Sequence, residues 1–262
     1  MRPIMRYPGA KWRLARWIIE QMPSHKVYLE PYFGSGAVLF NKEPQGVEII
    51  NDIDGDVVNL FRVMREKPRE LAMLVELTPW ARDEYENSYF KTGDSLEDAR
   101  RFLVRCWQAY ATRTKYKTGW RHTSYGKSSY MPDLWASIPE RIIQVARRLK
   151  TVQIENMDAV DLIEKHNHQS VLIYADPPYT LDTRNKLLYA HDMDLKGHEK
   201  LLDVLLRHKG PVMLSSYENE LYNQKLVGWF KKKITTVAEK GQKKEEVIWT
   251  NFSYTRQTIF NF

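Results

Sequence analysis

The sequence predicts an α/β fold in which a parallel sheet is interrupted by one inserted, mainly helical domain. Two observations lead to this prediction. Short apolar strand candidates alternate with amphipathic helix candidates before residue 66 and again after residue 150. Between these stretches the alternation stops, and helical periodicity with many basic residues takes its place. We therefore expect one domain from residues 1–57 and 151–262, with residues 58–150 inserted into it.

The first α/β stretch contains two strand candidates, each followed by a helical pattern. Residues 27–29 form a short strand that ends in the glycine-containing turn 30–36, and residues 37–40 after it have a helical pattern. Residues 47–50 form the second strand. Residues 56–65 then place four apolar side chains on one face of a helix: Val57, Leu60, Phe61 and Met64.

The inserted stretch combines helical and basic segments. Residues 96–110 and 138–149 have apolar side chains at helical spacing. Between them, residues 113–127 carry five Lys or Arg residues and no acid, interleaved with aromatic residues. Such a segment is typical of a nucleic-acid contact, and a solvated basic turn is the alternative. The basic runs 231–233 and 240–244 near the end of the chain are expected to be solvated surface, with phosphate contact as an open alternative.

After residue 150 the alternation resumes. We expect strands at 151–155, 171–175 and 211–215, and helices at 158–166 and 196–208. The strand 171–175 is apolar throughout, as expected for a parallel strand that is covered on both faces.

The composition limits the classes to which the chain can belong. Its 262 residues are 43% hydrophobic, enough for a sizeable core, and its net charge of +7 points to a polyanionic partner. Cys106 is the only cysteine, which excludes a disulfide framework and a cysteine-based zinc site. The histidines lack metal-ligand spacing, and no run of 18 apolar residues occurs. We expect a cytoplasmic protein without a metal or a membrane contact.

A turn with two glycines, Gly34 and Gly36, follows the first strand and lets a ligand approach the backbone closely. Asp52 stands at the end of the second strand, where an acid can accept hydrogen bonds from the hydroxyls of a nucleoside ribose. The alternative, that Asp52 caps the next helix, stays open. Leu39 stands where a dinucleotide site has a third glycine, and Glu30 precedes the turn. Both features favour a nucleoside cofactor without phosphates.

The strand 171–175 ends in the motif Asp176-Pro177-Pro178-Tyr179. Ligands of open α/β sheets bind at such carboxyl ends of strands. Proline fixes φ and has a carbonyl acceptor but no N–H, so the motif is a rigid ledge of acceptors beside an aromatic ring. This combination suits a planar base with an exocyclic amino group. An ordinary Pro-Pro turn with a surface tyrosine is the alternative.

Four motifs in this order resemble those of the Dam-type family of DNA adenine methyltransferases: Tyr7–Lys11, Glu30–Gly36, Asn51–Asp54 and Asp176–Tyr179. The resemblance implies a Rossmann-like, S-adenosylmethionine-dependent methyltransferase domain at 1–57 and 151–262. It also implies a helical DNA-recognition domain at 58–150. The implied partner is double-stranded DNA, and we expect a monomer or a weak dimer.

The resemblance further implies roles for individual residues. Seven of them would bind S-adenosylmethionine: Tyr7, Lys11, Phe33, Gly34, Asp52, Asp158 and Asp176. Tyr7 stands where family members often have a tryptophan, and it keeps an aromatic ring there. For Asp158, capping of the helix 158–166 is an equally open alternative.

The implied reaction is methylation of the exocyclic amino group of a flipped-out adenine. The amino lone pair is delocalised into the ring, so this nitrogen is a poor nucleophile. Acceptance of the amino hydrogens by the Asp176 carboxylate and the Pro177 carbonyl would free the lone pair, and Tyr179 would stack on the base. Two rivals remain open: methylation of the cytosine amino group, and a DNA-binding protein on this fold without activity.

The resemblance places a DNA contact in the basic segment. The expected contacts are Arg113, Lys115, Tyr116, Lys117, Arg121 and Lys127. Arg113 and Arg121 are candidates for bidentate contact with guanine, whereas the lysines hold phosphates. Family members that methylate GATC carry an Asn-Gly turn and a Phe-Asn-x-Pro segment here, and this chain has neither. We therefore predict DNA reading in this segment without predicting GATC as the sequence that is read.

Overall fold

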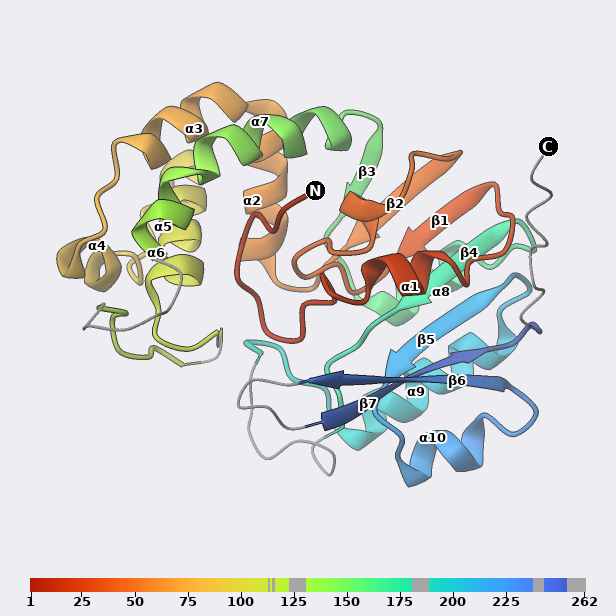
Figure 1. The fold of residues 1–262 in the computed structure, drawn as a ribbon. Coiled ribbons are helices and arrows are strands. Elements are labelled where there is room, and N and C mark those ends of the chain that lie inside the picture. The colour runs from red at the N-terminus through yellow and green to blue at the C-terminus, as the bar shows by residue number, and fades with distance from the viewer. Residues whose placement is uncertain (113, 115, 123–130, 181–188, 238–242, 254–262) are drawn as a thin grey trace, which may run out of the picture.

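A seven-stranded sheet in the order β3-β2-β1-β4-β5-β7-β6 forms the centre of the molecule (Figure 1). The computed structural model describes residues 1–262 except 113, 115, 123–130, 181–188, 238–242 and 254–262. The neighbours among the first five strands are parallel, whereas β7 is antiparallel to both β5 and β6. The strands are β1 (Val27–Glu30), β2 (Val47–Asn51), β3 (Val152–Glu155), β4 (Val171–Ala175), β5 (Val212–Ser216), β6 (Phe230–Val237) and β7 (Lys243–Thr250).

Helices connect these strands and also make up the insertion between β2 and β3. They are α1 (Ala15–Ile19), the 3-10 helix η1 (Leu39–Asn41), α2 (Gly55–Glu66), α3 (Pro68–Glu76), α4 (Arg82–Asn87), α5 (Ser95–Gln108), α6 (Met131–Ala136), α7 (Ile138–Leu149), α8 (Ala159–Lys165), α9 (Leu195–Arg207) and α10 (Glu220–Lys225). Within the described residues, no helix is long and apolar enough to cross a membrane.

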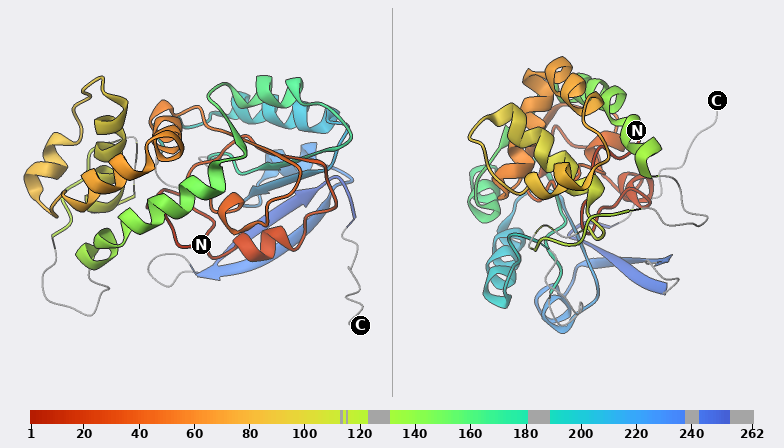
Figure 2. Two further views of the ribbon diagram at one scale, coloured as in Figure 1. Left: turned by 90° about the horizontal axis from the view of Figure 1, so that it is seen from above. Right: turned by 90° about the vertical axis from the view of Figure 1, so that its left-hand side faces the viewer.

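Both faces of the sheet are covered, because its parallel strands bury side chains on both sides. In β4, Leu172 and Tyr174 belong to the same core cluster as the apolar faces of α2, α5 and α7. Ile173 and Ala175 belong to a second cluster with α8 and α9. Figure 2 shows α1 on one face of the sheet and α8 and α9 on the other. The predicted α/β fold with covered parallel strands is confirmed.

The helices α3 to α7 lie together at one side of the sheet, beside α2 (Figure 1). α2 packs against α5 and α7, and α3 packs against α7. A buried ion-pair network attaches this group to the sheet. In it, Glu48 of β2 accepts hydrogen bonds from Lys42 at 3.0 Å and from Arg148 of α7 at 2.5 and 2.8 Å. The predicted boundary at residues 57 and 58 falls inside α2, and the division into two domains stays a proposal.

One predicted helical segment differs from the structure. Residues 37–40 do not form an α-helix, and only the short η1 follows the glycine turn. Gly34 and Gly36 have φ of +49° and +68°, so the chain is still in the turn at residue 36. Lys42 is already extended at φ −86° and ψ 138°, which leaves room for little more than one helical turn. The helix N-terminus expected behind this turn is therefore reduced to a single turn.

Candidate active site

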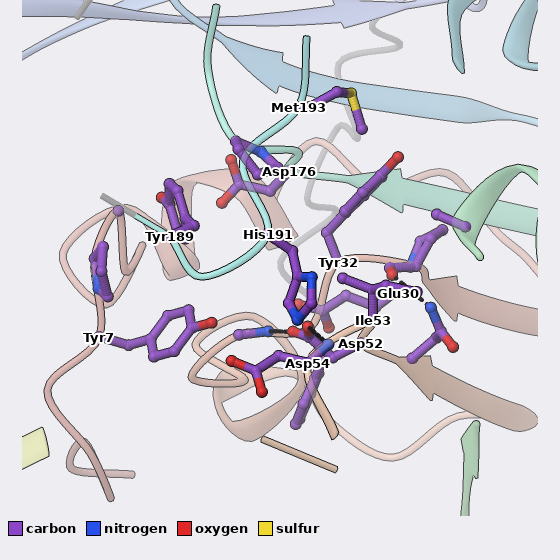
Figure 3. Close-up of a pocket in the computed structure, with 18 of the residues that line it drawn as sticks. Tyr7, Glu30, Tyr32, Asp52, Ile53, Asp54, Asp176, Tyr189, His191 and Met193 are labelled. Carbon is purple, nitrogen blue, oxygen red and sulfur yellow. Dashed lines mark hydrogen bonds between the residues drawn. The ribbon is translucent and has the colours of Figure 1, made fainter. Parts of the chain in front are cut away.

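A cavity of about 440 Å³ is lined by residues that follow β1, β2 and β4. The strand order reverses between β1 and β4, and open α/β sheets bind ligands at this kind of position. In Figure 3, Asp176 lies on one side of the space, Asp52 and Asp54 lie on the other, and His191 lies between them. The seven residues predicted to bind the cofactor all line this cavity: Tyr7, Lys11, Phe33, Gly34, Asp52, Asp158 and Asp176.

Asp52 holds the glycine turn against the end of β2. Its carboxylate accepts hydrogen bonds from the backbone N–H of Gly34 at 2.8 Å and of Asp54 at 3.0 Å. The residue that caps α2 is Asp54, whose side chain accepts from the N–H of Asp56. The alternative in which Asp52 caps this helix is therefore wrong. Burial raises the pKa of Asp52 to about 6, while the two backbone hydrogen bonds oppose the shift.

Tyr7 packs directly on the glycine turn. A Cβ atom placed on Gly34 would lie 3.2 Å from carbon atoms of the Tyr7 ring, so a larger residue at 34 would push the ring away. Gly34 itself has a positive φ, which a side chain would also strain. The ring of Tyr7 therefore forms one wall of the cavity at the place where the backbone turns.

Lys11 joins the N-terminal motif to the motif after β4. Its ammonium lies 3.0 Å from Oδ1 of Asp176 and donates a hydrogen bond to the Gly9 carbonyl at 3.0 Å. Lys11 is only 6% exposed, and the ion pair is therefore shielded from water. Burial raises the pKa of Asp176 to about 6, although the positive charge of Lys11 acts against this shift.

Tyr179 has a different environment from the one expected for a free stacking platform. The Lys11 ammonium lies 4.6 Å from the centroid of its ring, and the ring of Tyr217 meets it edge-on at 4.6 Å. Its hydroxyl donates a hydrogen bond to Oε2 of Glu246 on β7 at 2.5 Å. Neither Pro177 nor Tyr179 is among the described residues that line the cavity, whereas Pro178 is. The stacking role of Tyr179 stays a prediction.

Asp158 stands at the start of α8 and at the wall of the cavity. Its side chain caps α8 by accepting from the N–H groups of Val160 and Asp161, and the residue also lines the cavity. Helix capping by Asp158 is confirmed. A contact with the cofactor stays a proposal.

Several cavity residues were not predicted as site residues. Glu30 is buried at the end of β1, where it accepts a hydrogen bond from the Tyr28 hydroxyl at 2.8 Å, and burial raises its pKa to about 8. Its place directly before the glycine turn was the signal that could have identified it. The other described residues of this kind include Tyr32, Ile53, Asp54, Tyr189, His191, Asp192, Met193 and Asp194. Those after residue 188 carry no recognisable motif.

The basic segment of the insertion is described in part. Arg113, Lys115 and Lys127 lie outside the described residues. Tyr116 is 54% exposed, and Lys117 is also exposed and forms an ion pair with Glu86 of α4. The main chain of Arg121 donates to the Gln108 carbonyl at 2.7 Å, and its side chain donates to the Ala109 carbonyl at 3.2 Å.

These contacts fold the described part of the basic segment back onto the end of α5. Ala109 and Trp120 form an isolated antiparallel bridge there. The roles predicted for Tyr116, Lys117 and Arg121 in DNA binding stay predictions. Among the described residues, no group of three or more His, Cys, Asp or Glu side chains is placed to hold a metal ion.

The sequence is similar to those of several DNA methyltransferases. A type II methyltransferase of Lactococcus lactis subsp. cremoris is 32% identical over 101 residues, which cover 38% of this chain and 34% of that protein. The DNA N-6-adenine-methyltransferase of Escherichia phage P1 is 26% identical over 78% of this chain and 28% of its own length. The DNA adenine methylase of Serratia marcescens is 23% identical, covering 84% of this chain and 85% of that protein.

The chain thus spans about a third of the length of the first two relatives and most of the third. A family model, that of the D12 class N6 adenine-specific DNA methyltransferases, matches residues 7–244, nearly the whole chain. This match confirms the resemblance to Dam-type enzymes that the four motifs indicate. The chain belongs to the family of D12 class N6 adenine-specific DNA methyltransferases.

Proposed function

We propose that this chain transfers a methyl group from S-adenosylmethionine to the exocyclic amino group of adenine in duplex DNA. The observation that carries the proposal is the position of Asp176. It lies at the end of β4, at the wall of the cavity and beside the buried ammonium of Lys11. A rigid acceptor at this point could accept hydrogen bonds from the amino group and hold it in place. Membership of the family favours adenine over cytosine as the methylated base.

The lining of the cavity fits S-adenosylmethionine, which carries a net positive charge at neutral pH. Lys11 is the only Lys or Arg among the described lining residues. The acids are more numerous: Glu30, Asp52, Asp54, Asp158, Asp176, Asp192 and Asp194. Such a lining would attract a cation and repel a pyrophosphate, which supports a cofactor without phosphates.

Particular residues would hold the parts of this cofactor. Asp52 already accepts two backbone hydrogen bonds, and its remaining lone pairs are suited to ribose hydroxyls. The turn at Gly34 and the ring of Tyr7 would form the adjoining wall. When bound, S-adenosylmethionine supplies an electrophilic methyl group and a good leaving group on its sulfonium sulfur.

Asp176 and Pro177 would prepare the amino group for attack. With a pKa of about 6, the Asp176 carboxyl is mostly ionised at neutral pH and accepts hydrogen bonds rather than donating them. Two acceptors on the amino hydrogens favour a pyramidal nitrogen, whose lone pair then points away from the ring. A base inside a duplex cannot reach this wall, so the adenine must be flipped out at a cost of about a few kcal/mol.

The proposal is tested with duplex DNA of mixed sequence and cofactor labelled in its methyl group. Wild type should label the DNA, and digestion should release the label as N6-methyladenine. Asp176→Ala should lower the rate by about 100-fold or more, because an electrostatic partner of the reacting group is lost. Asp161→Asn is the matched control, since Asp161 is an exposed acid on α8. Label in N4-methylcytosine would favour the cytosine rival, and absence of label would favour the inactive DNA-binding rival.

The finer expectations belong to the same proposal. Tyr116, Lys117 and Arg121 would contact DNA from the insertion, because they form part of its basic segment and Tyr116 and Lys117 are exposed. Double-stranded DNA as substrate implies action in the cytoplasm of a bacterium or of a phage-infected host. Light scattering of the purified protein would test the expected monomer or weak dimer.

A further inference from the structure

Glu246 is a buried acid that reaches the catalytic motif from the far end of the chain. It lies on β7 and is 8% exposed. Its Oε2 accepts the hydrogen bond of the Tyr179 hydroxyl at 2.5 Å, and Oγ of Ser215 on the adjacent strand β5 lies 3.4 Å from the same hydroxyl. The position of the Tyr179 side chain is thus fixed from β5 and β7.

The same cluster holds two carboxylates for one ammonium. Asp176 forms the ion pair with Lys11, and the negative charge of Glu246 acts on both of them. Glu246 raises the pKa of Asp176, because protonation of Asp176 removes the repulsion between the two carboxylates. It also raises the pKa of Lys11, because it attracts the protonated ammonium. Among the described residues, the titratable groups that interact with Asp176 include Lys11 of the N-terminal segment, Glu30 of β1, Tyr174 of β4, Tyr179, Tyr217 after β5, Tyr222 of α10 and Glu246 of β7.

We propose that Glu246 is a positioning residue for methyl transfer, which fixes Tyr179 through its hydroxyl and acts on Asp176 through its charge. This inference rests on the proposed function, since it assumes that Asp176 grips the amino group. Glu246 touches neither the base nor the cofactor in this view. It acts through the two residues of the motif that lie between it and the cavity.

A purely structural role explains the arrangement less well. Burying a carboxylate costs free energy, which the hydrogen bond from the neutral phenol of Tyr179 offsets only in part, and Glu246 shares the attraction of the Lys11 ammonium with Asp176. A glutamine would accept the same hydrogen bond through its amide oxygen without the charge. If only the position of Tyr179 mattered, a neutral acceptor would hold it equally well, and the buried negative charge of Glu246 would not be needed. We therefore expect Glu246→Gln to alter catalysis even where the protein folds normally.

The neighbouring residue provides a matched control. Glu245 lies on the same strand, but its side chain is 59% exposed and pairs with Lys233 at 3.5 Å. Glu245→Gln makes the same chemical change one residue away, on the opposite face of β7. The set of variants is Glu246→Gln, Glu245→Gln and Tyr179→Phe. Thermal unfolding of each variant checks that it is folded before its activity is interpreted.

The readout is the single-turnover rate of methyl transfer as a function of pH, together with cofactor affinity. In wild type the rate should fall as the pH drops through about 6, where Asp176 takes up a proton. In Glu246→Gln this fall should occur at lower pH, because removal of a nearby negative charge lowers the pKa of Asp176. The ratio of variant to wild-type rate should therefore increase as the pH falls below 6. Loss of a residue that only supports the fold would not shift the pH at which the rate falls.

Tyr179→Phe tests the other half of the proposal. Loss of the hydroxyl should lower the rate about tenfold or more through misplacement of the motif, with cofactor affinity within about twofold of wild type. The double variant of Tyr179→Phe and Glu246→Gln should show both effects, the lower rate of the first and the shifted pH profile of the second, because Tyr179→Phe removes the contact whereas Glu246→Gln removes only the charge.

The proposal is overturned if Glu246→Gln matches Glu245→Gln in both rate and pH profile, or if Tyr179→Phe transfers methyl groups at the full rate. Should Glu246→Gln fail to fold, the rate of Tyr179→Phe still decides. A wild type that leaves DNA unlabelled would instead overturn the proposed function, and the inference with it.

Discussion

Glu30→Gln should stabilise the folded protein, by an amount that grows as the pH rises. Glu30 is 2% exposed, and burial raises its pKa from 4.5 to about 8. An acid whose pKa is raised on folding binds its proton more tightly in the folded state. Its favourable contribution is complete below about pH 4.5 and is lost as the pH rises to about 8. Glutamine cannot ionise, so the variant avoids this loss.

The size of the effect follows from the shift. Each pKa unit corresponds to about 1.4 kcal/mol, so the difference between variant and wild type should grow by at most about 5 kcal/mol between pH 4.5 and pH 8. The hydrogen bond from the Tyr28 hydroxyl can persist in the variant, because the amide oxygen of glutamine also accepts. The change in packing is small, and the titration dominates the comparison.

The assay is urea unfolding at several pH values between about 5 and 8.5, followed by tryptophan fluorescence. Glu199→Gln is the control, since Glu199 is an exposed acid on α9. Its difference from wild type should stay near zero at every pH. A difference between Glu30→Gln and wild type that is constant across this range would refute the reasoning, because it would mean that Glu30 titrates alike in both states.

Two further predictions concern binding. Asp52→Ala should weaken S-adenosylmethionine binding by about 1–3 kcal/mol, the scale of a hydrogen bond to a charged group, as measured by calorimetry. Unchanged affinity would mean that Asp52 only holds the glycine turn. Lys117→Ala should reduce the slope of DNA affinity against salt by about one unit without changing the methylated sequence. The exposed Lys26, at the opposite end of β1 from the cavity, is its control, and an equal effect of Lys26→Ala would contradict a specific phosphate contact.

The part of the site that lies at strand ends could be predicted from the sequence. Strands β1, β2 and β4 are short apolar runs, so their carboxyl ends were identifiable, and parallel strands bring those ends to one edge. Asp52 and Asp176 follow two of these ends directly and line the same cavity. The local sequence was enough to predict these two site residues, because a residue that directly follows a parallel strand lies at the edge of the sheet where the cavity is.

Contacts that depend on strand pairing could not be predicted in this way. Glu246 meets Tyr179 across 67 residues of sequence, and only the antiparallel pairing of β7 with β5 brings them together. The basic run 231–233 was expected to be solvated surface, with phosphate contact as an open alternative, and Lys231 and Lys233 are indeed exposed. What the sequence did not indicate is that both side chains form ion pairs with Glu218, because residues two apart along a strand lie on one face.

The buried negative charges around Asp176 destabilise the fold at high pH, and the same charges bear on binding of the proposed cofactor. Burial raises the pKa of Asp176 and of Glu30, and repulsion adds to both shifts: Glu246 acts on Asp176, and Asp176 acts on Glu30. A positive charge that entered this space would relieve the repulsion. The proposed cofactor carries one on its sulfur, whereas the product left after methyl transfer does not. The same buried acids that weaken the fold at high pH would therefore favour binding of the methyl donor over its spent form.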